Sequence, residues 1–104
     1  MQKKLSFNEL INGDKPVLVD FMATWCGPCK AMNPILGEVA KKMGEKAQIV
    51  QVDVDRNPAI AGKLGIMGVP TFIVYKDGKA FWRQSGMQSA KKLTQVLEDA
   101  ASAN

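Results

Sequence analysis

Apolar residues recur along the chain in two patterns, one typical of buried strands and one typical of helices. Residues 16–22 (PVLVDFM) and 47–55 (AQIVQVDVD) are short runs rich in branched and large apolar side chains, which predict two buried β-strands. From Cys26 to about Gly44, apolar residues return every three or four positions, with polar residues between them. Residues 89–101 repeat this spacing. The pattern therefore predicts two long amphipathic helices.

Capping residues mark two shorter helices. Ser6 is followed three residues later by Glu9, the spacing of a capping box, so a helix begins here and we expect Gly13 to end it. Residues 57–65 (NPAIAGKLG) predict a second short helix, because Asn57 can cap its start and a proline follows at the first helical position.

A β-hairpin is predicted for residues 71–84, where two apolar runs flank Asp77-Gly78, a dipeptide that favours a two-residue turn. Ser89 then caps the last helix. The order of elements is helix, strand, helix, strand, helix, strand, strand, helix. Strand–helix–strand units predict a parallel core with helices on both faces, and the hairpin adds an antiparallel edge. We therefore predict an α/β fold of three layers around one mixed sheet.

Composition fits one globular domain over residues 1–104, with 46% hydrophobic and 23% charged residues. The net charge is +4, but the basic residues are spread among acidic ones, which argues against a nucleic-acid-binding surface. No stretch of 18 apolar residues is present, so we expect no membrane contact. The first ten residues lack the apolar segment of a secretory signal, which predicts a cytoplasmic protein.

The chain has two cysteines, Cys26 and Cys29, and no histidine. Structural zinc and iron–sulfur clusters usually take four ligands, so a metal site would require two chains to share it.

A purely structural disulfide here would close a very small ring and contribute about 2 kcal/mol. Cysteines three residues apart on a helical turn lie about 5–6 Å apart, within reach of a disulfide. This spacing favours a pair that opens and closes reversibly.

The two cysteines are predicted to differ in reactivity. Cys26 falls at the start of a helix, where free N–H groups and the helix dipole favour a thiolate. Pro28 suits the first turn, and Gly27 has no side chain to block an incoming disulfide. Cys29 lies one turn further in, on the apolar face, and we expect it to be more shielded. The prediction is that Cys26 attacks and Cys29 resolves.

The sequence resembles the thioredoxin family over nearly its whole length. The matching segments are WCGPCK (25–30), VDF (19–21), Pro34, GVPT (68–71), KDG (76–78) and Gly86. The resemblance implies a thioredoxin fold, with a mixed sheet of four or five strands and about four helices. It also implies a monomeric enzyme without a cofactor or metal that reduces protein disulfides. Its electrons would come from a flavin-dependent thioredoxin reductase.

The resemblance also assigns positions around the cysteines. Pro70 matches the cis-proline that faces the cysteine pair in this family, whereas the residues alone leave it an ordinary trans proline. Gly68, Val69 and Pro70 would form a ledge on which a substrate strand forms hydrogen bonds. Pro34 would kink the cysteine helix, because proline lacks an N–H and clashes with the preceding turn.

Asp20 is the candidate proton donor and acceptor. Its neighbours in VLVDFM are apolar on both sides, so burial would raise its pKa; spacing alone equally allows an ionised, partly solvated residue at the strand end. Cys29 must lose a proton to become a nucleophile, and without histidine the base must be a carboxylate or water. In thioredoxins the matching residue is a buried carboxylate beneath the cysteines, which favours the buried interpretation.

The sequence departs from the family pattern at several positions. Met22 stands where a tryptophan is common, and the segment before Ser6 is short, so the usual first strand is expected to be reduced or absent. Gln51 stands where many members have a lysine near the buried acid. Without that positive charge, we expect Asp20 to be harder to ionise.

Substrate contacts are expected from Trp25, Met67, Gly86 and Met87, together with the ledge. Two interpretations of the methionines stay open. They fill loops, or they form a deformable apolar rim with Trp25 and Val69 that accepts many partners.

Two rival functions also stay open: an extracytoplasmic disulfide oxidase or isomerase, and a binding subunit in which the redox chemistry is incidental. The Gly27-Pro28 dipeptide and the missing signal favour a reductase.

Overall fold

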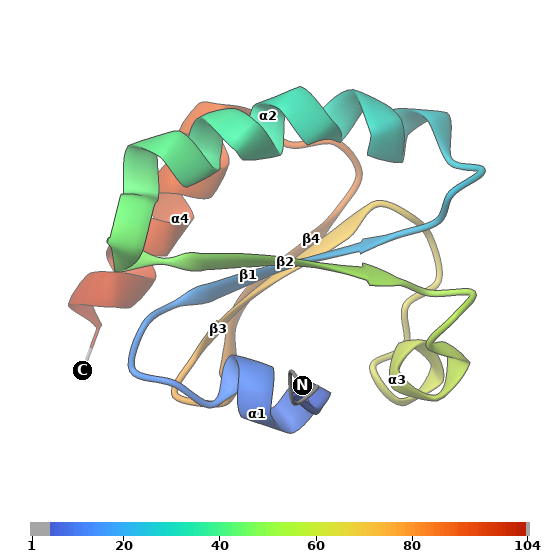
Figure 1. Cartoon of the computed structure of the whole chain (residues 1–104), viewed down its shortest axis with the longest axis horizontal. Helices are drawn as coiled ribbons and strands as arrows, with labels where there is room; N and C mark the ends of the chain where they lie inside the picture. Colours follow the sequence, from blue (N-terminus) through green and yellow to red (C-terminus); the bar gives the residue numbers. More distant parts are fainter. Residues whose placement is uncertain (1–4, 104) are drawn as a thin grey trace, which may run out of the picture.

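The computed structural model describes residues 5–103, which form a four-stranded sheet between two pairs of helices (Figure 1). The elements follow in the order α1 (Phe7–Ile11), β1 (Val17–Met22), α2 (Gly27–Met43), a 3-10 turn η1 (Gly44–Lys46), β2 (Gln48–Asp53), α3 (Pro58–Lys63), β3 (Thr71–Lys76), β4 (Lys79–Ser85) and α4 (Ala90–Ser102). Helices α2 and α4 cover one face of the sheet, and α1 and α3 cover the other. The predicted three-layer α/β fold is confirmed.

The sheet has the strand order β2-β1-β3-β4. Strands β1 and β2 are parallel, whereas β1 with β3 and β3 with β4 are antiparallel. The mixed sheet was predicted, but the expected parallel core is reduced to one pair. Residues 54–70, which include the short helix α3, do not carry the chain back along the sheet. Strand β3 therefore starts at the end of the sheet where β2 stops and pairs antiparallel with β1.

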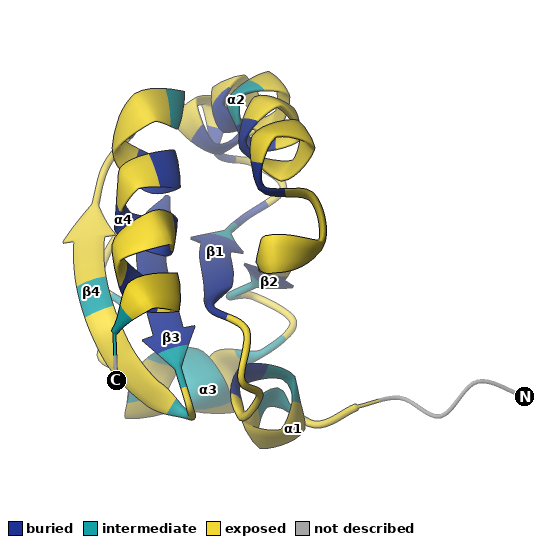
Figure 2. Ribbon diagram, turned by 90° about the vertical axis from the view of Figure 1, so that its left-hand side faces the viewer, coloured by how far each residue is buried: buried dark blue, intermediate teal, exposed yellow. Residues whose placement is uncertain are grey.

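Two hydrophobic cores flank the central strands. Every residue of β1 and β3 except the last is buried, and Figure 2 shows both strands in the dark blue of buried residues. Alternation along each strand divides these side chains between the faces. Leu18 and Phe72 pack with α2 and α4, whereas Val19 and Tyr75 pack on the side of α1 and α3.

The segment 47–55 is not the buried strand that its composition predicts. Strand β2 occupies one edge of the sheet, and Val52 is its only buried residue. An edge strand has one neighbour instead of two, so its side chains remain partly exposed despite their apolar character. Within residues 5–103 the sheet has four strands, and residues 1–4 lie outside the described part of the chain.

Local capping signals predicted some helix ends and missed others. Ser6 and Glu9 form the complete capping box of α1, with hydrogen bonds of 3.2 and 3.0 Å. Gly13 does not end that helix, because α1 already stops at Ile11. Asn57 does occupy the cap position of α3, but its side chain donates to the backbone carbonyl of Asp53 and caps nothing.

The hairpin turn has the predicted geometry. Asp77 and Gly78 have φ values of 54° and 80°, the left-handed conformation that the tight turn between β3 and β4 requires. Ser89 caps α4 by accepting a hydrogen bond of 3.0 Å from the N–H of Lys92, as predicted. None of the helices described between residues 5 and 103 has the length and apolar character that crossing a membrane requires.

Candidate active site

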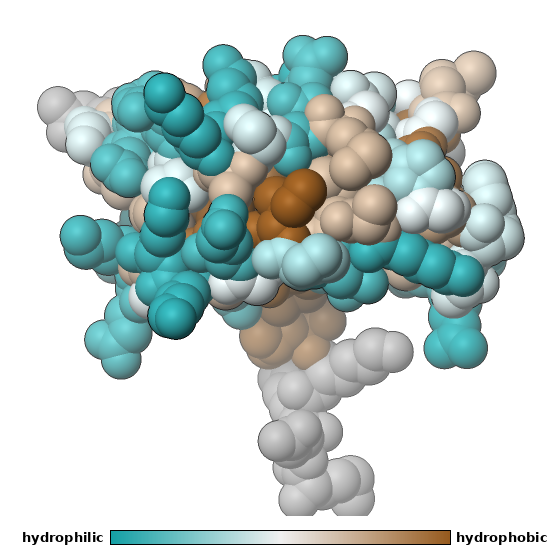
Figure 3. Space-filling model, turned by 90° about the horizontal axis from the view of Figure 1, so that it is seen from above, coloured by the Kyte–Doolittle hydropathy of each residue, from teal (hydrophilic) through white to brown (hydrophobic). Residues whose placement is uncertain are grey.

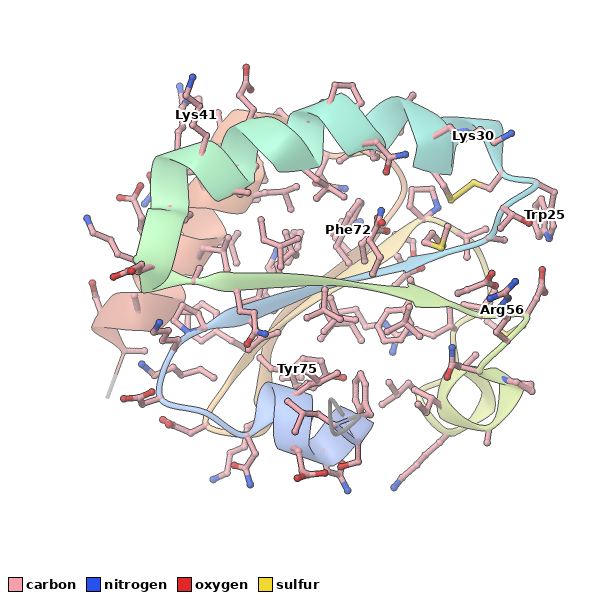
Figure 4. All side chains as sticks on the ribbon, viewed as in Figure 1. Trp25, Lys30, Lys41, Arg56, Phe72 and Tyr75 are labelled. Atoms are coloured by element: carbon pink, nitrogen blue, oxygen red, sulfur yellow. A yellow bond between two sulfur atoms is a disulfide. The ribbon has the colours of Figure 1, made fainter. Side chains whose placement is uncertain are left out.

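The cysteine pair lies where the chain leaves β1 and enters α2. Cys26 and Cys29 are joined by a disulfide, with their Cα atoms 5.2 Å apart. Figure 4 shows this bond at the end of α2 that carries Lys30, with the Trp25 side chain at the tip of the preceding loop. The helical spacing of the two cysteines therefore brings their sulfur atoms into bonding distance, as predicted.

Cys26 is the N-terminal cap of α2. The backbone N–H of Cys29 points at the Sγ atom of Cys26, 3.1 Å away, and Pro28 occupies the first turn. In the reduced protein, this N–H and the positive end of the 17-residue helix would stabilise a thiolate on Cys26. The predicted position of Cys26 at the N-terminus of a helix is confirmed.

The expected difference in shielding between the cysteines is absent. Cys26 is 3% exposed and Cys29 is 2% exposed. In the disulfide form the two cysteines form one cluster with Ala23, against which Met22 and Val69 pack, so their side chains are buried to the same extent. The two cysteines differ in position: the Sγ atom of Cys26 accepts a hydrogen bond from the N–H of Cys29, and within residues 5–103 Sγ of Cys29 has no such bond from the helix backbone.

Asp20 is fully buried in β1. Its Oδ2 atom accepts a hydrogen bond of 3.1 Å from Nε2 of Gln51, and its Oδ1 atom has no hydrogen-bond partner within residues 5–103. Burial raises the pKa of Asp20 from the ordinary 3.8 to about 6, and the Gln51 hydrogen bond lowers it only in part. The predicted burial is confirmed, and the partly solvated alternative is wrong.

Strand alternation places Asp20 beneath the start of α2. Leu18, two residues before it, packs on α2, and Met22, two residues after it, packs against the cysteines. Gln51 is the register partner of Asp20 on β2, and its Nε2 atom also donates to Oδ1 of Asn33, one turn after Cys29, at 3.0 Å. Sequence reasoning missed Asn33, because its contact depends on how α2 packs over β2.

The loop before β3 faces the cysteines. The Val69–Pro70 peptide bond is cis, and the carbonyl oxygen of Val69 lies 3.7 Å from Sγ of Cys26. Two hydrogen bonds hold this loop: Thr71 Oγ1 donates to the carbonyl of Gly68 at 2.6 Å, and the N–H of Gly86 donates to the carbonyl of Pro70 at 2.8 Å. The cis geometry implied by the family resemblance is confirmed.

Trp25 and Met67 form an exposed apolar surface beside this loop. Their side chains are 69% and 95% exposed, and with Gly68 and Val69 they line a shallow hollow of about 110 Å³. The indole N–H of Trp25 donates to Oδ2 of Asp55 at 2.8 Å, which fixes one edge of the ring. Asp55 was not singled out from the sequence, although it follows β2 as Trp25 follows β1, and the two strands are parallel.

Two further predicted residues lie outside this hollow. Met87 is half exposed but does not line it, so of the two methionines only Met67 borders this hollow among the described residues. Pro34 lies inside α2, as expected.

Seen from the α2 side, the surface is mostly hydrophilic or neutral, with hydrophobic colour concentrated near its centre (Figure 3).

Comparison with known proteins decides the family. The thioredoxin family model matches residues 1–99. The chain belongs to the thioredoxin family. A thioredoxin from Alicyclobacillus acidocaldarius is 43% identical over 94 residues, which are 90% of each chain. Among solved structures, a thioredoxin mutant from Halobacterium salinarum superposes with a TM-score of 0.85 at 30% identity, covering 99% of this chain and 89% of that one. Residues 5–103 thus form a thioredoxin fold, with four strands and four α-helices in that part of the chain.

Some thioredoxin relatives are longer than this chain. Chloroplastic thioredoxin Y1 from Arabidopsis thaliana is 48% identical over 101 residues, which are 93% of this chain but 59% of that protein. Chloroplastic thioredoxin Y from rice is 49% identical over 96 residues, 91% of this chain and 57% of that protein. The chain therefore spans less than two thirds of the length of these relatives.

Proposed function

We propose that the protein is a thiol–disulfide oxidoreductase that reduces disulfide bonds in other proteins. The observation that carries this proposal is the Cys26–Cys29 disulfide at the N-terminus of α2, opposite the cis Val69–Pro70 bond. Membership of the thioredoxin family supports the same activity.

The reaction requires two exchange steps. The Cys26 thiolate attacks one sulfur of a target disulfide, the target S–S bond breaks, and its other sulfur leaves as a thiolate that takes up a proton from solvent. Cys29 then loses its proton and attacks Cys26 Sγ. The mixed disulfide breaks, the second target sulfur leaves as a thiolate, and Cys26–Cys29 closes. Two electrons have then passed from the protein to the target.

Asp20 is proposed to accept the Cys29 proton. Its pKa of about 6 lets the carboxyl group be largely ionised at neutral pH while remaining basic enough to hold a proton transiently. Its place beneath the start of α2 and its unpaired Oδ1 atom support this role. Within residues 5–103, no three histidine, cysteine, aspartate or glutamate side chains lie close enough together to bind a metal ion.

The ledge of Gly68, Val69 and Pro70 is proposed to hold a substrate strand through backbone hydrogen bonds. Gly27 and Gly68 support this proposal. Neither has a positive φ, and a Cβ atom added at either would meet open space, so the fold itself does not require glycine there. We propose that glycine at these two positions leaves room for the backbone of a substrate to approach the cysteines. Gly86 supports the ledge through its hydrogen bond to Pro70.

A thioredoxin reductase is the proposed electron donor, because the oxidised pair must be reduced again after every turnover. This cycle requires a compartment that keeps thiols reduced, and we propose the cytoplasm. We also propose that the protein acts as a monomer, since one chain supplies every residue of the site.

The test is insulin-disulfide reduction with the wild type, Cys26→Ser and Cys29→Ser. Both variants should lose turnover, and only Cys29→Ser should accumulate a mixed disulfide, which mass spectrometry detects. A variant that keeps turnover would contradict the mechanism. If the protein oxidises dithiols and does not reduce insulin, it is the oxidase or isomerase. If the double serine variant keeps its biological role, it is the binding subunit.

A further inference from the structure

Asn33 is an exposed residue of α2, one turn after Cys29, and the reaction steps above give it no role. Its Oδ1 atom accepts a hydrogen bond of 3.0 Å from Nε2 of Gln51 on β2. Inside a helix, asparagine is less favourable than alanine, because its side chain competes for backbone hydrogen bonds. Asn33 therefore costs α2 some helix stability, and its contact with β2 is the feature that sets it apart from alanine.

Gln51 joins Asn33 to the buried acid. The same Nε2 atom that donates to Asn33 also donates to Oδ2 of Asp20, at 3.1 Å. A primary amide nitrogen carries two hydrogen atoms, so both bonds form at once. Within residues 5–103 this is the only side-chain hydrogen bond to the Asp20 carboxyl group, since Oδ1 has no partner. The stability of the ionised carboxylate thus depends on how one amide group is oriented.

The Gln51 side chain needs support to keep that orientation. Gln51 is exposed on the edge strand β2, and together with Asn33 it lines a hollow of about 460 Å³ between α2 and β2. A long side chain beside solvent has many rotamers, and ordering it costs entropy. The second hydrogen bond restricts these rotamers. Because Oδ1 of Asn33 is an acceptor, it also favours the orientation in which Gln51 presents its nitrogen rather than its oxygen to Asp20.

The other neighbours of Asp20 cannot replace this hydrogen bond. Its register partner on β3 is Phe72, which is apolar and fully buried. Above it, at the start of α2, lie Cys26 and Cys29, which do not titrate while they form a disulfide. In the reduced protein their thiols are the titratable groups on this side of the sheet.

Two charged residues follow on the neighbouring elements. Lys30 comes directly after Cys29 on α2 and is exposed, and Asp53 lies two residues after Gln51 on β2. Neither is a cause of the shifted pKa of Asp20, which burial raises and the Gln51 hydrogen bond lowers. A change at position 33 would therefore affect Asp20 through Gln51.

We propose that Asn33 is a positioning residue for Asp20: by accepting a hydrogen bond from Gln51, it holds the Gln51 amide against the carboxyl group. This arrangement favours the ionised form of Asp20. Its consequence for turnover rests on the function proposed above, in which ionised Asp20 accepts the Cys29 proton. Its effect on the carboxyl group itself does not depend on that function.

The first test is the pKa of Asp20, followed by ¹³C NMR of its carboxyl carbon in the full-length chain with the disulfide closed. Gln51→Met keeps a side chain of similar length but removes the amide, and should raise the pKa by about 0.4–1.1, the effect of one hydrogen bond. Asn33→Ala should produce at least about half of that rise. An unchanged or lower pKa in Asn33→Ala would overturn the proposal.

The double variant, Asn33→Ala with Gln51→Met, tests the route. Adding Asn33→Ala to Gln51→Met should leave the pKa of Asp20 unchanged, because no amide remains to be held. A further rise would mean that Asn33 acts on Asp20 without Gln51, and it would overturn the proposal.

Insulin reduction between pH 5 and 9 tests the link to turnover. In Asn33→Ala the acid side of the kcat profile should move to higher pH, as the pKa of Asp20 does. KM should stay unchanged, because Asn33 does not line the hollow beside Trp25. If the pKa moves and the kcat profile does not, the proton-acceptor role of Asp20 fails, whereas the positioning of its carboxyl group by Asn33 is confirmed.

Discussion

Asp20 is an acidic residue placed where water does not reach it, and this position has a cost in stability. Its pKa is about 6 in the folded protein and near the ordinary 3.8 in the unfolded chain. Below about pH 4 both states hold the proton, so the carboxyl group has no effect on the free energy of unfolding. Between about pH 4 and pH 6 the unfolded chain has released its proton while the folded protein still holds it. Stability is therefore lost across this window and stays lower above it.

Asp20→Asn should remove this loss. At pH 7 the variant should be more stable than the wild type by on the order of 2–3 kcal/mol, because a shift of about two pKa units is worth that much. The gain should shrink to nearly zero below pH 4. Turnover should fall by about tenfold to 100-fold, because Cys29 loses its proton acceptor. Chemical denaturation between pH 3.5 and 8 and insulin reduction measure the two effects.

Gln51→Lys is the matched comparison for Asp20→Asn. It keeps the carboxyl group and adds a positive charge beside it, which should lower the pKa of Asp20 in the folded protein, so that the stability loss is smaller and is complete at a lower pH. If Asp20→Asn gained the same stability at pH 3.5 as at pH 7, ionisation of Asp20 would not be the cause. An unchanged reductase rate would rule out the proton-acceptor role.

At the scale of elements, α1 and α4 begin alike but carry different charges. Both are capped by a serine, but Ser6 is followed by Glu9 in a complete capping box, whereas Ser89 is followed by Lys92 at the same spacing. Lys92 and its neighbour Lys91 lie at the positive end of the α4 dipole. The sequence of α4 therefore opposes its own dipole, and nothing in the structure explains this.

Lys92→Glu should stabilise the protein by about 1 kcal/mol, because it completes a capping box with Ser89 and reverses the charge at the helix start. Lys91→Glu reverses the same charge at a position where no capping box can form, so it should gain only about half as much. Thermal unfolding of both variants measures the difference. Equal gains would mean that the dipole alone is responsible.

Local sequence signals predicted the elements whose ends depend on a few neighbouring residues. The Ser6 capping box and the Asp77-Gly78 turn form as expected, because their hydrogen bonds and φ angles involve residues close in sequence. The edge position of β2 and the direction of β3 could not be predicted in this way. Both depend on which strands become neighbours in the sheet, and that depends on contacts between segments far apart in the sequence.

The same distinction applies to the candidate site. The positions of Cys26 and Pro70 could be predicted, because a short motif specifies each. Asn33 and Asp55 could not. Asn33 contacts Gln51 only because α2 lies over β2, and Asp55 contacts Trp25 only because the ends of the parallel strands β1 and β2 lie side by side. Side chains that complete a site from a neighbouring strand leave no local pattern in the sequence.

At the scale of the whole molecule, three segments far apart in the sequence meet around one sulfur pair. The loop after β1 provides Trp25, the start of α2 provides the cysteines, and the loop before β3 provides Met67 and Val69. The sheet brings these segments together because β1 and β2 end, and β3 begins, at the same end of it. A protein substrate would therefore touch a surface assembled by the fold.

Met67→Ala should weaken the use of protein substrates through this surface. The side chain is 95% exposed beside Trp25, so its loss should not affect stability, but it removes apolar area that a bound protein would cover. A loss of about 1 kcal/mol corresponds to about a fivefold lower kcat/KM for insulin. A small disulfide reagent, which cannot span the hollow, should react at an unchanged rate.

Met87→Ala is the control, because Met87 is also exposed but does not line the hollow. If both variants lost the same activity toward insulin, or if the small reagent were affected equally, contact with Met67 would not determine substrate use.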